Sequence, residues 1–382
     1  MYFKHNTLNP NQAVYTHKTV SLPTMNNSLN LFLCISILYF SMNSFSTFGQ
    51  TTQQYKIVTI AFYNVENLFD YEDDPLTFDD DRTPEGKDHW TPDIYQQKID
   101  NIAKVIAEIG VETSKNAPII IGLAEIENQK VLEDLIANQA LASYNYQIVH
   151  YDAPDRRGID VALLFQKKIF IPTHTSKHEL LIYDTDAPDK RVYTRDQLLV
   201  SGVLDGDAIH FLVNHWPSRR GGEKRSAYKR MAAAKLNKKI IDSLQTEDPY
   251  AKIITMGDLN DDPTSPSLKK ILKTKGTKKT VPIKGLYNPM ESLHHKGYGS
   301  LAYGDRWNLF DQIIMSKAVL NKETNGYHYY KSGIYSPSFL TTPTGRYKGY
   351  PFRSFANGHF TGGYSDHFPV YLHLVRAVKD KN

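Results

Sequence analysis

The sequence is poor in cysteine: Cys34 is the only one among 382 residues. A single cysteine excludes a disulfide within the chain and a zinc site built from several cysteine ligands. Net charge is also small, because 45 Lys and Arg face 41 Asp and Glu and leave a formal charge of +4. Attraction to nucleic acid or to anionic lipid must therefore come from local patches of charge.

The N-terminal apolar run is short. Residues 31–40 fall well below the roughly 20 apolar residues that a bilayer-spanning helix needs. The run has the length of the apolar part of a secretory signal peptide, and the small residues Thr47 and Gly49 would permit cleavage after Gly49. We therefore predict an N-terminal extension and signal peptide over residues 1–49, with Met25 as an alternative start, and a secreted or periplasmic protein. A buried N-terminal strand or an uncleaved anchor is the alternative.

The rest of the chain has the composition of a folded domain. With 41% hydrophobic and 23% charged residues, wholesale disorder is excluded. No linker rich in Pro, Gly or Ser divides residues 55–376. We therefore predict one domain over residues 50–382, monomeric, without a stable protein partner and without a transmembrane segment.

Short apolar or alternating runs bounded by turn residues predict strands. They cover residues 57–62, 118–123, 159–165, 197–203, 209–214, 252–256, 311–315 and 369–374. Apolar residues at three- and four-residue spacing predict helices over 95–109 and 227–244. This mixture predicts an α/β fold with more than one sheet.

An acidic segment follows the first predicted strand, over residues 70–88. We interpret it as a solvated insertion. A structural Ca²⁺ site is the alternative, although the spacing of the carboxylates matches no EF-hand loop.

Polar side chains fall where the predicted strands end, which is where ligands and catalytic groups collect in α/β folds. These residues are Asn64, Glu125, Asn214, His215, Asp258, Asn260, Asp366 and His367. The oxygen ligands of Glu125 and Asn64 suit Mg²⁺ or Mn²⁺, and two histidines beside carboxylates suit proton transfer and oxyanion stabilisation. The sequence has no HExxH, GxSxG, Walker or GxGxxG motif, so zinc proteolysis, α/β-hydrolase chemistry, NTP hydrolysis and dinucleotide redox lack their usual signatures. The reaction class that still fits is the metal-assisted attack of water on a phosphoester.

Four short motifs, read in order with Asn64 and Glu125, carry a family resemblance. They are NHWPS at 214–218, GDLND at 257–261, FDQI at 310–313 and SDHFPV at 365–370. The set resembles the endonuclease/exonuclease/phosphatase superfamily, which includes deoxyribonuclease I, and the resemblance covers residues 56–374. It implies a four-layer α/β/β/α sandwich of two packed mixed β-sheets with helices outside, and a metal-dependent phosphoric ester hydrolase.

The resemblance also implies roles for single residues. Metal binding would fall to Asn64, Glu125 and Asp366, and catalysis to His215, Asp258, Asn260, Asp311 and His367. Asp258 would orient or deprotonate the attacking water, and Asn260 would hold the scissile phosphate or the nucleophile. His367, oriented by Asp311, would contact the phosphoryl oxygen, and His215 would act as hydrogen-bond donor or general acid.

Four further positions have weaker support. Arg195 precedes a predicted strand where family members carry a phosphate-binding arginine; a surface salt bridge is the alternative. Arg219 and Arg220 follow His215 in an Arg-rich loop and are predicted to bind substrate phosphate. Asp160 either orients His215 or caps the start of a strand.

Two substrate classes fit the sequence. A nuclease that cleaves DNA or RNA is the leading hypothesis, because Arg-rich loops adjoin the predicted site. A phosphatase or phospholipase C-like enzyme, of the sphingomyelinase or inositol phosphatase type, acting on lipid or sugar phosphates, is the alternative; the aromatic segment 348–360 would be its membrane-facing loop.

Overall fold

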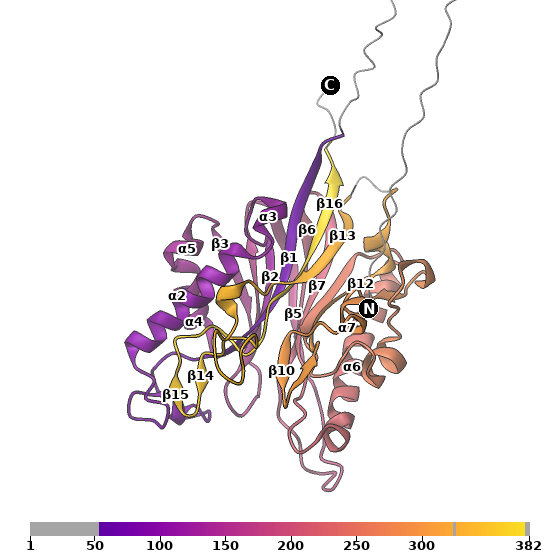
Figure 1. Ribbon diagram of the computed structural model, residues 1–382. Coiled ribbons are helices and arrows are strands. Elements are labelled where there is room, and N and C mark those ends of the chain that lie inside the picture. The colour runs from indigo at the N-terminus through magenta and orange to yellow at the C-terminus, as the bar shows by residue number, and fades with distance from the viewer. Residues whose placement is uncertain (1–52, 324–325, 379–382) are drawn as a thin grey trace, which may run out of the picture. The chain divides into compact units, whose positions relative to one another are not determined.

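The computed structural model describes residues 53–323 and 326–378 (Figure 1). All predicted site residues lie in these ranges. The predicted extension and signal peptide, residues 1–49, and the alternative start Met25 lie outside the described residues. Among the described residues, no helix combines the length and the apolarity needed to span a bilayer.

Two mixed sheets of six strands each form the centre of the fold. The first contains, in spatial order, β13 (His328–Ile334), β16 (Val370–Ala377), β1 (Tyr55–Leu68), β2 (Ile120–Ile126), β4 (Asp160–Gln166) and β3 (Tyr146–His150). The second contains β5 (Phe170–His178), β6 (Gln197–Leu204), β7 (Asp207–His215), β8 (Ile253–Asp258), β12 (Asp311–Ser316) and β9 (Leu286–Tyr287). Two small hairpins lie outside these sheets: β10 (Leu301–Tyr303) with β11 (Arg306–Asn308), and β14 (Phe355–Ala356) with β15 (His359–Phe360).

Helices lie on the outer face of each sheet (Figure 1). The α-helices are α2 (Pro92–Glu108), α3 (Val111–Ser114), α4 (Gln129–Ala137), α5 (Gln139–Ala142), α6 (Glu223–Glu247) and α7 (Met290–His295). Short 3₁₀ turns are η1 (Asp80–Arg82), η3 (Lys278–Thr280), η4 (Lys317–Leu320) and η5 (Ser338–Leu340), and η2 (Ser267–Leu272) is a π-helical turn.

Three apolar layers hold the sandwich together. Side chains alternate between the faces of a strand, so Phe62 of β1 packs between the two sheets against the cluster that includes Phe211, while its neighbour Tyr63 packs under α2 and α4. In the second sheet, Leu212 and Ile241 lie in the layer between β7 and α6. The fold is therefore the four-layer α/β/β/α sandwich that the sequence predicts.

Besides the strands of two or three residues, the sequence analysis did not predict three strands of the described residues: β3, β5 and β13. Each has at most one buried residue, and each lies at an edge of its sheet. An edge strand pairs with a neighbour on one side only, and most residues of these three strands are not buried. Their sequences therefore lack the continuous apolar run that marks a central strand.

The acidic segment 70–88 is a loop that contains η1. Asp70 and Asp79 accept backbone N–H hydrogen bonds within it. Among the described residues, its carboxylates do not converge into a group of three metal-ligand atoms. The Ca²⁺ alternative gains no support from this geometry.

Strand direction brings the predicted site residues to one end of both sheets, the lower end in Figure 1. β1 and β2 run parallel, and so do β7 and β8, which sets His215 opposite Asp258. β12 runs antiparallel to β8 and sets Asp311 opposite Asp258 from the other side. Three site residues thus stand side by side in one sheet because of register alone.

Candidate active site

The first sheet presents Asn64 and Glu125 at strand irregularities. The pairing of β1 with β2 shifts register between Asn64 and Leu68, and that of β2 with β4 shifts at Glu125. Such bulges re-aim side chains next to functional sites. Glu125 has φ of 65° and Glu66 has φ of 53°, values that non-glycine residues rarely adopt and that cluster at active sites. The backbone N–H of Asn67 donates to Oε2 of Glu125 at 2.9 Å, which fixes the carboxylate.

The second sheet presents Asp258 with Asn260 two residues beyond it. Asn260 has φ of 49°, and this turn allows its backbone N–H to donate to Oδ1 of Asp258 at 2.9 Å. Its side-chain amide donates to the carbonyl of Trp216 at 3.0 Å. Trp216 is therefore buried beneath the site, at 1% exposure, as packing support.

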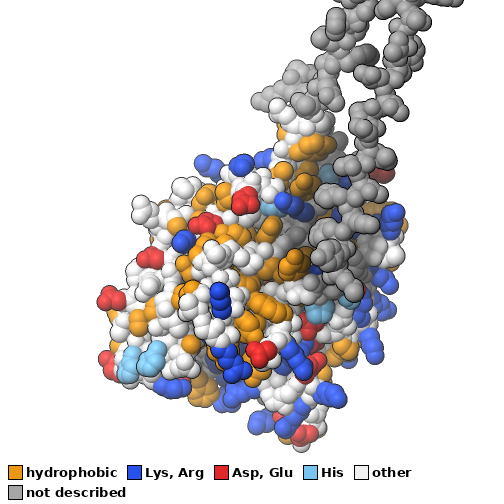
Figure 2. Space-filling model, in the orientation of Figure 1, with side chains coloured by type: hydrophobic (Ala, Val, Ile, Leu, Met, Phe, Trp, Pro, Cys, Tyr) orange, Lys and Arg blue, Asp and Glu red, His pale blue; other side chains and the backbone are white. Residues whose placement is uncertain are grey.

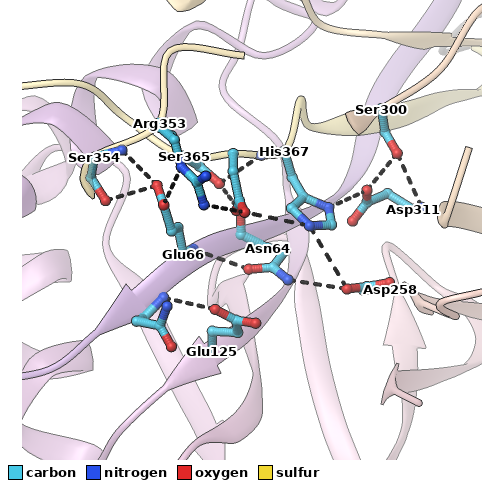
Figure 3. Close-up of polar contacts among 12 residues, drawn as sticks. Asn64, Glu66, Glu125, Asp258, Ser300, Asp311, Arg353, Ser354, Ser365 and His367 are labelled. Atoms are coloured by element: carbon cyan, nitrogen blue, oxygen red, sulfur yellow. Dashed lines mark hydrogen bonds and ion pairs between the residues drawn. The ribbon is translucent and has the colours of Figure 1, made fainter. Parts of the chain in front are cut away.

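His367 and Asp311 form a tight pair (Figure 3). Nδ1 of His367 lies 2.6 Å from Oδ2 of Asp311, and the hydroxyl of Ser300 donates to the same oxygen at 2.5 Å. Burial alone would lower the pKa of His367, but the charge and hydrogen bond of Asp311 outweigh it and hold the pKa well above its usual value. His367 is therefore an imidazolium whose Nε2 is directed away from Asp311.

Contacts between the two sheets join the site residues of the first sheet to those of the second. The amide of Asn64 donates to Oδ2 of Asp258 at 3.2 Å. Nε2 of His215 lies 3.6 Å from that oxygen and 3.8 Å from Oε1 of Glu125. Nε2 of His367 lies 4.0 Å from Oδ2 of Asp258. Residues that are far apart in the sequence thus surround one carboxylate.

The environment pushes the pKa values of His215 and Asp258 away from their usual values. Burial, with Arg195 and Arg157 nearby, lowers the pKa of His215 well below its usual value, so its imidazole is neutral. Its Nδ1 is buried and has no hydrogen-bond partner among the described residues. Burial raises the pKa of Asp258 to about 6. A carboxylate with a pKa just below neutrality suits a general base.

A cleft of about 410 Å³ opens onto this group. Besides Glu125, His215, Asp258, Asn260 and His367, cationic side chains line it: Arg156, Arg157, Arg195, Arg220 and Lys229. A larger cavity of about 610 Å³ is lined by residues that include Trp307 and Phe368, and its lining contains none of the site residues described above. The smaller cleft is therefore the candidate active site.

Comparison with known proteins agrees with this geometry. A profile described as the Endonuclease/Exonuclease/phosphatase family matches residues 59–376. The chain belongs to this family. As a family member, it is a metal-dependent phosphoric ester hydrolase. A search of curated proteins finds no match.

Solved structures resemble this family member in fold. A humanised TDP2 from D. rerio is 13% identical, with 84% of this chain and 99% of that chain covered and a TM-score of 0.50. A Bacteroides thetaiotaomicron protein of the same family is 18% identical, with 86% and 98% covered and a TM-score of 0.48. A mannosyl-6-phosphatase from Bacteroides thetaiotaomicron is 18% identical, with 83% and 99% covered and a TM-score of 0.48.

The residues present fit the divalent metal that this family uses. Glu125 lines the cleft with one oxygen fixed by a backbone N–H, and carboxylate and amide oxygens are the ligands that hard divalent cations prefer. Asp258 and Asp311 form a group with His367 whose potential ligand atoms lie within 4.8 Å of one another; of these, the two carboxylates could hold a metal, whereas a protonated His367 could not. Oδ1 of Asp311 is buried and has no hydrogen-bond partner among the described residues.

The predicted arginines differ in where they lie. Arg195 is buried and donates to Asp155 at 2.9 Å and to the carbonyl of Trp216 at 2.8 Å, yet it lines the cleft. Arg220 is exposed and also lines the cleft. Arg219 does not join them: its guanidinium donates to the carbonyl of Asn260 at 2.9 Å and to three carboxylates, those of Glu223, Asp261 and Asp262.

Asp160 pairs with His150, not with His215. Its Oδ2 lies 3.1 Å from Nε2 of His150, and its Oδ1 accepts the backbone N–H of Ala153 at 2.8 Å. Both carboxylate oxygens thus hold the start of β4 and the turn before it. This geometry corresponds to the strand-start alternative for Asp160.

Sequence reasoning assigned no role to several residues that hold the site in place. Ser300 fixes Asp311, and the hydroxyl of Ser365 donates to the carbonyl of Asn64 at 2.7 Å while accepting the N–H of His367 at 3.0 Å. Asp366, predicted as a metal ligand, lies 3.1 Å from Arg353, which also contacts Glu66. Ser365 could have been found within the SDH motif, whereas Ser300 and Arg353 lie in loops without a pattern.

Proposed function

We propose that this chain is a secreted, divalent-metal-dependent phosphodiesterase that hydrolyses phosphodiester bonds of DNA or RNA. The observation that carries the proposal is the cleft, where five cationic side chains lie beside the converging acid and base groups. Arginine forks bind phosphate oxygens in two places at once. Such a rim suits a substrate with phosphates on either side of the scissile one.

The side chains divide the chemistry between them. Asp258 takes the proton of the attacking water, and Asn260 positions that water or the scissile phosphate. The imidazolium of His367 donates from Nε2 to a phosphoryl oxygen, with Asp311 holding the ring, and neutral His215 donates a second hydrogen bond. Each such donor contributes about 3–4 kcal/mol to transition-state stabilisation in a water-poor site.

Glu125 and Asn64 would hold the metal, which we propose to be Mg²⁺ or Mn²⁺. When bound, a divalent cation supplies charge neutralisation on the phosphoryl oxygens. Asp366, predicted from the sequence as a third ligand, is paired with Arg353 at 3.1 Å, and we propose no contact between it and the metal. Export through residues 1–49 is likewise a proposal.

Figure 2 shows Lys and Arg side chains at the lower end of the molecule, where the loops around the site lie. Local charge of this kind attracts a polyanion even though the total charge is near zero. The alternative function, hydrolysis of sugar or lipid phosphates, is favoured by the modest volume of the cleft, about 410 Å³, which suits a single small phosphate ester.

Salt dependence separates these substrates. Replacing Arg157 and Arg220 with Ala should weaken binding of single-stranded DNA at low salt and lower the slope of log affinity against log salt by roughly 1–2, because each arginine that contacts phosphate releases a counterion. Binding is measured by fluorescence anisotropy in Ca²⁺ or EDTA, and turnover in Mg²⁺ or Mn²⁺. Arg346→Ala, whose side chain is 74% exposed and lies outside the cleft, is the matched control.

If the slope is unchanged, DNA and RNA stay intact and phosphate is released from a sugar phosphate, the result would favour hydrolysis of sugar or lipid phosphates over the nuclease function. Release of phosphocholine from sphingomyelin vesicles would assign the phospholipase C-like form.

A further inference from the structure

Arg353 lies beside Glu66 at the edge of the site (Figure 3). Its Nε lies 3.2 Å from Oε1 of Glu66, and its Nη2 lies 3.1 Å from Oδ2 of Asp366. One planar guanidinium therefore joins a residue of β1 to a residue of the segment before β16. This is the fork geometry that arginine provides and lysine does not.

The backbone around Arg353 is fixed by contacts that are not part of the catalytic group. Ser354 donates its backbone N–H and its hydroxyl to Oε2 of Glu66, at 2.5 and 2.9 Å. Asn101 of α2 donates to the carbonyls of Gly362 and Gly363 at 3.0 and 2.8 Å. The position of Arg353 is thus built into the fold, although half of its side chain is exposed.

An aromatic cluster holds the same segment from the other side. Phe355 and Phe360 of the β14–β15 hairpin lie 5.7 and 6.0 Å, between ring centroids, from Trp90, which is buried. Aromatic pairs at this separation add to the stabilisation from burial. The hairpin therefore anchors the segment that carries Arg353 to the helical side of the first sheet.

Lys98 is, after Arg353, a second positively charged side chain that belongs to the protein itself in this region; the two are called the resident cations. Lys98 is fully buried and donates to the hydroxyl of Ser354 at 2.8 Å and to the carbonyl of Tyr364 at 2.7 Å. Burial lowers the pKa of Lys98 to about 8, against the favourable charges of Glu66 and Asp366. Lys98 and Glu66 thus share one serine hydroxyl.

The three carboxylates of this region are not equivalent. Glu125 lines the cleft, whereas neither Glu66 nor Asp366 does. The two resident cations, Lys98 and Arg353, lie beside Glu66 and Asp366, and neither of them forms an ion pair with Glu125.

We propose that Arg353 is a resident cation of the active site: it pairs with both Glu66 and Asp366 and, together with Lys98, balances their two negative charges, so that the centre binds one divalent cation, at Glu125, rather than two. The inference rests on the assignment of Glu125 to the metal in the proposed function. Arg353 is thus a positioning residue that sets the metal stoichiometry. It withholds Asp366 from the metal and keeps its carboxylate oriented beside His367, whose Nε2 lies 3.9 Å from Oδ1 of Asp366.

The test is an Mn²⁺ titration of the full-length chain, followed by electron paramagnetic resonance and by equilibrium dialysis, without substrate. Wild type should bind one Mn²⁺ per chain. Arg353→Gln should bind a second, weaker ion, because Glu66 and Asp366 lose their counter-charge. Arg353→Gln combined with Asp366→Asn should return to one ion, and Arg353→Lys, which keeps the charge, should also bind one. Arg346→Gln is the control in the same segment, and circular dichroism checks folding of each variant.

Two ions in the wild type, or one ion of unchanged affinity in Arg353→Gln, would overturn the inference. Because the titration needs no substrate, both results leave the proposed hydrolysis intact. A wild type that binds no Mn²⁺ would contradict the metal site of the proposed function and this inference with it.

Discussion

Replacing His367 with Ala should lower kcat by about 10²–10⁴-fold, the range that a positioned proton donor or acceptor contributes. The reason is the pair that His367 forms with Asp311, at 2.6 Å, which in the proposed mechanism would keep an imidazolium directed at the phosphoryl oxygen. Initial rates are measured on the purified variant at saturating Mg²⁺ or Mn²⁺. His174→Ala, an exposed histidine of β5, serves as the control and should retain wild-type rates.

The same pair predicts a pH effect. Asp311 raises the pKa of His367, so His367 keeps its proton as pH rises through neutrality. In Asp311→Asn the charge is lost while the burial remains, and burial lowers the pKa of a histidine. The alkaline limb of the pH–rate profile should therefore move to lower pH. A full rate in His367→Ala, or an unmoved limb in Asp311→Asn, would remove this residue from the mechanism.

Replacing Glu125 with Gln should weaken Mn²⁺ binding by about 100-fold or more, because it removes a charged ligand, and loss of a group that only orients a ligand already costs about 10–100-fold in metal affinity. The shape of the side chain is kept, and the N–H of Asn67 can still donate to the amide oxygen that replaces Oε2. Affinity is measured by calorimetric titration and activity across a range of metal concentrations. Raising the metal concentration should restore part of the lost rate.

Glu112→Gln is the matched control, because Glu112 is an exposed residue of α3. Its metal titration should match that of the wild type. If Glu125→Gln also titrated like the wild type, the metal would belong to another group, and the carboxylates of Asp258 and Asp311 would be the next candidate.

The central strands could be predicted because burial on both faces leaves a local signature. β2 and β8 are almost wholly buried and β1 and β7 are buried over most of their length, and the buried parts contain near-continuous apolar runs. The polar residues that end these runs, such as Asn64 and Asp258, were recognisable for the same reason: they interrupt the apolar pattern at the edge of the sheet.

The supporting contacts of the site could not be predicted because they join segments far apart in sequence. Ser300 reaches Asp311 from the loop before β10, and Arg353 reaches Glu66 across 287 positions. The left-handed backbone at Glu66 and Glu125 is likewise imposed by the bulges of the assembled sheet, since glutamate has no intrinsic preference for this conformation. Arg219 is a case in which closeness in sequence was a poor guide to contacts. Its place near His215 in the sequence suggested substrate binding, while its guanidinium lies among carboxylates.

The measurement that tests metal-dependent phosphoester hydrolysis most directly is chelation followed by reconstitution. The full-length chain is stripped with EDTA, dialysed, and assayed on a chromogenic phosphodiester and on single-stranded DNA, with and without added Mg²⁺ or Mn²⁺. We predict background rates after stripping and recovery of hydrolysis when either metal is returned, with His367→Ala remaining about 10²–10⁴-fold slower than the wild type in either metal. Hydrolysis that persists after complete chelation, or that neither metal restores, would contradict the assignment of this cleft as a metal-dependent active site.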